Sequence, residues 1–69
     1  MSLLEEAIDV LGLFPRNKKS PMQLRVLYEK ARGEEKFKIG YMVEALYAAS
    51  ESEEDIKLIQ DAWVKDEED

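Results

Sequence analysis

Residues 20–33 read SPMQLRVLYEKARG and carry the signals for both ends of one helix. Ser20, Pro21 and Gln23 form a start signal, in which the serine caps the helix, the proline takes the first helical position and the glutamine closes a capping box. The glycine at the end of the stretch supplies the stop. The pattern therefore predicts an amphipathic helix over residues 21–32. Its apolar stripe consists of Leu24, Leu27, Tyr28 and Ala31, widened by Met22 and Val26.

A second helix is predicted before this stretch, over residues 3–11. Ser2 and Glu5 have the spacing of a capping box, and Gly12 provides the stop. Pro15 disfavours helical geometry in the residue before it, so we expect the connection between the two helices to be extended. The apolar positions at helical spacing are Leu3, Leu4, Ala7, Ile8 and Leu11.

The third predicted helix covers residues 36–49 and is apolar on almost every side. Such a helix is expected to lie centrally or to face a partner, so a homodimer or a partner helix could complete the core. Gly40 lies inside it, where glycine costs about 1 kcal/mol relative to alanine, and we expect another backbone to pack closely there. Its apolar members include Phe37, Ile39, Met42, Val43, Leu46 and Ala49.

The fourth predicted helix follows a cap at Ser50 or Ser52 and runs to about Lys65. Acidic residues occupy its first turn, where the helix dipole favours anions. The acidic residues 66–69 stand at the unfavourable end of that dipole, so we expect fraying there. Its apolar stripe consists of Ile56, Ile59, Ala62 and Trp63, which makes core packing the preferred role of the tryptophan. The four segments together predict an all-α fold, a small bundle of three to four short helices in a single domain over residues 1–69.

Composition argues against an enzyme and against a bound metal or cofactor. The chain has 69 residues and contains neither cysteine nor histidine, which removes thiolate ligands, the commonest general base and the commonest transition-metal ligand. The carboxylate runs lack the loop spacing of an EF-hand. No signal peptide or bilayer-spanning segment is recognisable, so a cytoplasmic protein without membrane contact is the default expectation.

Charge is unevenly distributed along the chain, whose formal net charge is -6. Residues 1–14 carry three acids and no bases, residues 15–38 carry eight bases and three acids, and residues 39–69 carry two bases and ten acids. Lys18 and Lys19 precede one predicted helix start, and Lys36 and Lys38 lie at another. The dipole makes a helix N-terminus partially positive, so lysines there favour a nearby anion.

Three sources of that anion remain open at this point. The acidic C-terminal third could fold back onto the basic segment, a partner protein could supply an acidic patch, or the anion could be a nucleic-acid backbone. We favour a small accessory or regulatory protein that binds another protein. The predicted contact residues are the cations Arg16, Lys18, Lys19, Arg25, Lys36 and Lys38, with Tyr41 and Tyr47 as apolar anchors.

The alternative is a nucleic-acid-associated, helix-turn-helix-like protein that uses the basic segment 16–38. The last three predicted helices suit that arrangement, and SPMQLRVLYEKARG is similar to the opening helix of response-regulator DNA-binding domains, over those residues alone and without a diagnostic motif. The helix that would enter the groove, SEEDIKLIQDAWVKD, is acidic, so phosphates would repel it. A minor variant is that the acidic end imitates nucleic acid toward a basic protein.

Overall fold

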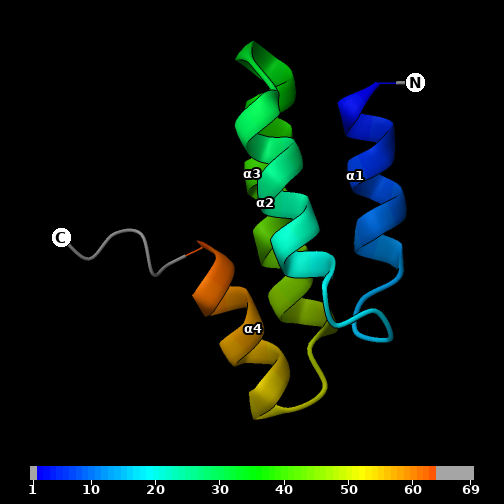
Figure 1. Cartoon of the computed structure of the whole chain (residues 1–69), viewed down its shortest axis with the longest axis vertical. Helices are drawn as coiled ribbons and strands as arrows, with labels where there is room; N and C mark the ends of the chain where they lie inside the picture. The colour runs from blue at the N-terminus through cyan, green and yellow to red at the C-terminus, as the bar shows by residue number, and fades with distance from the viewer. Residues whose placement is uncertain (1, 64–69) are drawn as a thin grey trace, which may run out of the picture.

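The computed structural model describes residues 2–63, and all regular secondary structure in that part of the chain is helical. The helices are α1 (Leu3–Gly12), α2 (Ser20–Lys30), α3 (Gly33–Ala49) and α4 (Glu53–Trp63). Helix α2 packs against the other three, and α3 also contacts α1 and α4 (Figure 1). The all-α bundle predicted from the sequence is confirmed. The predicted fraying at residues 66–69 falls outside the described residues.

Each helix contributes to one small core. The buried apolar side chains are Ala7, Phe14, Leu24, Leu27, Ala31, Ile39, Leu46 and Ile59. Four residues assigned to apolar stripes are instead exposed: Ile8 by 54%, Met22 by 64%, Val26 by 47% and Ile56 by 37%. A surface helix buries only the side that its neighbours cover, and apolar residues beyond that side stay in contact with solvent.

Helix α1 starts as predicted, and the connection after it does not follow the prediction. The hydroxyl of Ser2 accepts a hydrogen bond from the Glu5 N–H at 3.1 Å. After Gly12 the chain forms hydrogen-bonded turns rather than an extended link, because the Phe14 N–H bonds to the Leu11 carbonyl at 3.1 Å. Burial of the Phe14 side chain accompanies this compact path.

Helix α2 begins without the predicted capping box. Ser20 is fully buried, and its hydroxyl donates to the Val10 carbonyl of α1 at 2.9 Å. The side chain of Gln23 accepts from the Asn17 amide at 3.2 Å instead of reaching back to Ser20. The Val10 carbonyl also accepts from the Leu13 N–H at 3.1 Å, so Ser20 supplies its second hydrogen bond. The hydrogen bond joins the end of α1 to the start of α2.

Helix α3 begins three residues earlier than predicted, which changes its electrostatics. It starts at Gly33, whose φ of +62° is in the left-handed region that favours glycine. Glu34 and Glu35 therefore occupy the first turn, and the Glu35 carboxylate accepts from the Leu4 N–H of α1 at 3.0 Å. The prediction that Lys36 and Lys38 make the start of this helix cationic is therefore wrong, since acids occupy its first turn ahead of Lys36.

Candidate protein-binding surface

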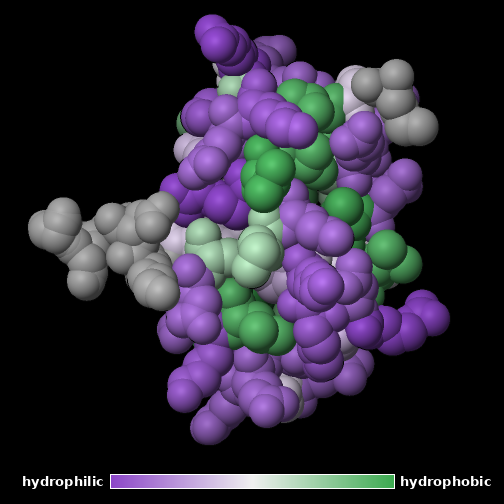
Figure 2. Space-filling view, viewed as in Figure 1, coloured by the Kyte–Doolittle hydropathy of each residue, from purple (hydrophilic) through white to green (hydrophobic). Residues whose placement is uncertain are grey.

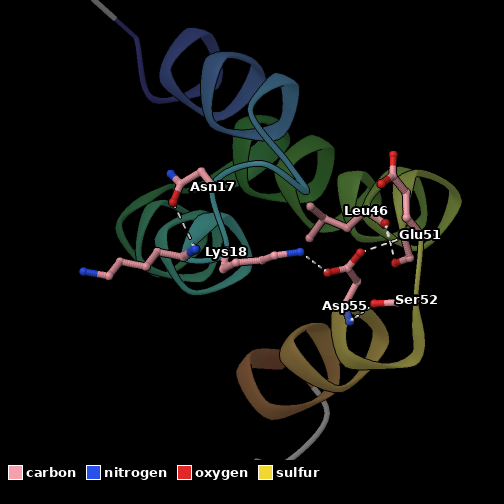
Figure 3. Close-up of polar contacts among 8 residues, drawn as sticks. Asn17, Lys18, Leu46, Glu51, Ser52 and Asp55 are labelled. Carbon is pink, nitrogen blue, oxygen red and sulfur yellow. Dashed lines mark hydrogen bonds and ion pairs between the residues drawn. The ribbon is translucent and has the colours of Figure 1, made fainter.

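The basic turn before α2 is linked to α4 by an ion pair. The Lys18 ammonium donates to a carboxylate oxygen of Asp55 at 2.7 Å, across the gap between the two elements (Figure 3). The Asp55 side chain is 1% exposed, whereas that of Lys18 is 57% exposed. Of the three anion sources considered, the acidic third of the chain therefore supplies the one next to Lys18.

Asp55 also organises the start of α4. Its second carboxylate oxygen accepts from the Glu51 N–H at 2.9 Å, and its own N–H donates to the Ser52 hydroxyl at 3.4 Å (Figure 3). The hydrogen bond from Lys18, followed by that from the Glu51 N–H, lowers the pKa of Asp55 below its ordinary value, and burial opposes this only in part. The charged carboxylate thus holds α4 to the basic turn.

Arg25 is likewise engaged within the chain. Its guanidinium donates to the Glu29 carboxylate at 3.0 Å and to the Ala62 carbonyl at 3.1 Å. The same group lies 5.4 Å from the centre of the Trp63 ring and 5.9 Å from that of Tyr28. These distances are typical of cation–π contacts, so Arg25 has a structural role between α2 and α4.

Trp63 packs as the sequence predicts. Its indole N–H donates to the Pro21 carbonyl at 3.0 Å, and its ring meets that of Tyr28 edge-on with centroids 5.1 Å apart. Lys36 covers Tyr28 from α3, with its ammonium 4.3 Å from the ring centre and 3.2 Å from the Tyr28 carbonyl. The tyrosine ring is therefore held in place by neighbours from two other helices.

Gly40 packs against that ring rather than against another backbone, which corrects the prediction. A Cβ at this position would lie 3.0 Å from the Tyr28 ring. Such a contact is tighter than most Cβ contacts, so a larger residue would require the tyrosine ring to shift by a few tenths of an ångström. Gly40 is thus the residue that lets α3 approach α2 at Tyr28.

We expect Gly40→Ala to lower the thermal midpoint despite the helix propensity of alanine. The propensity gain is about 1 kcal/mol, and displacing a ring packed in this way costs about 1–3 kcal/mol, so the net change is small and destabilising. The fluorescence of Trp63 should change with it, because the indole contacts the displaced ring. Ala45→Ser on the exposed face of α3 is the control, and a raised midpoint with unaltered emission would contradict the expectation.

Beside this ring lies an open groove, which we call the aromatic groove. Its volume is about 530 Å³, and the residues around it are Tyr28, Gly33, Lys36, Phe37, Lys38, Gly40 and Tyr41. Phe37 is 81% exposed and Tyr41 is 73% exposed, one helical turn apart on α3. Among residues 2–63, two lysines border the groove and no carboxylate does. An apolar surface of this kind is suited to an apolar side chain flanked by acids.

The predicted contact residues fall into separate places. Arg16, Lys18 and Lys19 lie in or next to the turn before α2, while Lys36, Lys38 and Tyr41 border the aromatic groove. Within residues 2–63 the side chains of Arg16, Lys19 and Lys38 have no hydrogen bond or ion pair. Tyr47, only 36% exposed, does not border the groove. Lys38 and Tyr41 are thus the predicted residues best placed for a partner.

Sequence reasoning missed the roles of Phe37 and Asp55. Phe37 was counted among the apolar positions of a central helix, yet at 100° per residue it lies on the side opposite the buried Ile39 and Leu46. That angular separation was a usable signal. No comparable signal existed for Asp55, because its partner Lys18 is distant in the sequence and only the tertiary fold brings the two together.

No helix within residues 2–63 combines the length and apolarity needed to cross a membrane. The same residues contain no cluster of three or more acidic side chains arranged to hold a metal ion. No protein-family model, no curated protein and no solved structure matches this chain. The functional argument therefore depends on the chain's own surface.

Proposed function

We propose that this chain is a small non-enzymatic accessory or regulatory protein that binds another protein. The aromatic groove is the contact site, and it receives a segment of the partner that combines acidic residues with an apolar side chain. The observation that carries the proposal is the exposure of Phe37 and Tyr41, at 81% and 73%, beside a hollow. Exposed aromatic side chains next to a concave surface are the residues that most often dominate protein interfaces.

Charge supports an acidic partner at this site. The chain as a whole carries a formal charge of -6, yet Lys36 and Lys38 give the border of the groove a local positive charge. Lys36 is held over the Tyr28 ring, so its charge is fixed in position before a partner arrives. A positive border attracts acidic segments to the aromatic groove through complementary charge.

A nucleic-acid backbone is the weaker candidate for the same surface. Lys18 and Arg25, which it would need, already contact Asp55, Glu29 and the Ala62 carbonyl. Helix α4 would have to enter the groove of the duplex, and it exposes Glu53 and other acids toward solvent. Phosphates are repelled by such a helix.

The test is selection of peptides from a displayed random library on the full chain. We expect the enriched peptides to combine Asp or Glu with an aromatic residue or leucine, and to bind in solution as measured by fluorescence anisotropy. Phe37→Ala and Tyr41→Ala should each weaken binding by about tenfold or more, since both remove exposed anchors. Lys38→Glu should slow association, because it reverses a charge that steers the acidic segment.

Met22→Ala is the matched control, because it removes another exposed apolar side chain outside the groove. It should leave peptide binding unchanged. Peptides without an acidic bias, or binding that survives both aromatic substitutions, would refute the proposal. A separate titration with duplex and single-stranded DNA over a salt series tests the alternative of nucleic-acid binding. An affinity that falls steadily as the salt concentration rises would favour that alternative.

A further inference from the structure

The outer face of α2 carries a second apolar surface, separate from the aromatic groove. Its exposed residues include Lys19, just before the helix, followed by Met22, Val26 and Glu29 at spacings of three, four and three. At 100° per residue these four positions form one stripe along the helix, opposite the buried Leu24 and Leu27. We call them the α2 stripe.

The α2 stripe lies on a broad and open face of the molecule. The chain measures 31 × 30 × 16 Å, and α2 lies nearest the viewer when the molecule is seen along its shortest axis (Figure 1). In the same view, apolar side chains gather over the middle of this face within a hydrophilic surround (Figure 2). Met22 also borders a hollow of about 420 Å³ between α2 and α4, where Leu58 and Ala62 extend the apolar surface and Lys18, Lys19 and Asp61 are the charged neighbours.

The order of residues along the stripe is self-complementary. It runs from a cation through two apolar side chains to an anion, so a second α2 laid antiparallel across it brings Lys19 opposite Glu29 and Met22 opposite Val26. A two-fold axis near residue 24 repeats both pairings. A parallel arrangement would instead oppose like charges, which is unfavourable.

We infer that the α2 stripe binds a second copy of this chain in an antiparallel, two-fold dimer. The antiparallel pairing of Lys19 with Glu29 supports this occupant, and the exposed Lys30 beside Glu29 would lie near the basic turn of the other copy and limit the attraction. Lys19 has no ion-pair partner within residues 2–63, and the Glu29 side chain stays 60% exposed while bonded to Arg25. The contact centres on one short helix from each chain, so the dimer is expected to be weak and reversible.

Sedimentation equilibrium on the full chain, up to about 1 mM, tests the association. We expect a monomer–dimer equilibrium whose dissociation constant rises about tenfold or more in Met22→Glu and in Lys19→Glu. The double variant Lys19→Glu with Glu29→Lys should restore the dimer, because the ion pair between the two copies is kept with its charges exchanged. Lys57→Glu on α4 is the matched control for the change in charge and should leave the dissociation constant unaltered.

Cysteine cross-linking tests the direction of the helices, since the chain contains no cysteine of its own. An equimolar mixture of Met22→Cys and Val26→Cys chains, oxidised in air, should yield mainly mixed disulfides between the two variants. A strict monomer at the highest concentration, or a dimer indifferent to Met22→Glu, would overturn the inference. Failure of the double variant to restore association, or a preference for disulfides between identical variants, would do the same. Circular dichroism on each variant confirms that the helices persist.

Discussion

Leu24→Ala should lower the free energy of unfolding by about 3 kcal/mol, within the usual range of 2–5 for such a change. Leu24 is fully buried on α2, which packs against all three other helices, as α3 also does, so the cavity would lie where several helices meet. A chain of this length has little stability in reserve. We therefore expect a partly unfolded population at room temperature, measured by urea titration followed by circular dichroism.

Met22→Ala is the control for this experiment, because it shortens a side chain on the opposite side of the same helix. Met22 is 64% exposed, and its replacement should change the free energy of unfolding by less than about 0.5 kcal/mol. Measurements at low micromolar concentration keep self-association from contributing. Similar losses for the two variants would mean that α2 is not the helix around which the core is built.

Acidification should destabilise the fold through Asp55. The pKa of this carboxyl is lowered in the folded protein from its ordinary value of 3.8, chiefly by the hydrogen bond from Lys18. The unfolded chain therefore takes up the proton first, and the stabilisation is fully present above pH 3.8 and lost as the pH falls through the lower folded pKa. We expect the thermal midpoint to fall as the pH drops below 3.8.

Asp55→Asn should lower the midpoint at neutral pH and flatten its dependence on pH in the acid range. At neutral pH the loss should be about 5–10 °C, the size expected when a buried hydrogen-bonding group loses a charged partner in a small domain. Asp61→Asn on the same helix is the control, because Asp61 is exposed and its replacement should preserve the acid transition. An Asp55→Asn variant that retains the full acid transition would show that other carboxyls are responsible.

Local sequence signals determined much of the secondary structure. The serine cap at Ser2 forms, because its hydroxyl accepts from the Glu5 N–H, and α4 carries its acids in the first turn as predicted. These features depend on residues within one turn of each other, which is why spacing alone reveals them. The local pattern was wrong at Ser20. It predicted that the hydroxyl caps α2, whereas the hydroxyl donates a hydrogen bond to the Val10 carbonyl of α1.

The candidate surface was only partly predictable. The sequence singled out Lys36, Lys38 and Tyr41 by charge and aromatic character, and all three border the aromatic groove. It could not separate these from Lys18, because an ion pair across 37 positions depends on how α4 packs against the rest of the chain. The distribution of charge along a sequence shows which acidic segments could pair with a cation, but it does not show which of them does.

By itself, the sequence determined that this chain is helical, where most of its helices begin and end, and which segment is basic. Periodicity and capping depend on residues close together in the sequence, so they can be recognised without knowledge of the tertiary fold. The tertiary structure alone decided which residues of the predicted apolar stripe of α2 remain outside, Met22 and Val26 among them, and which cations are already paired. Both outcomes depend on which side of each helix its neighbours cover, and that is settled only when distant segments pack together.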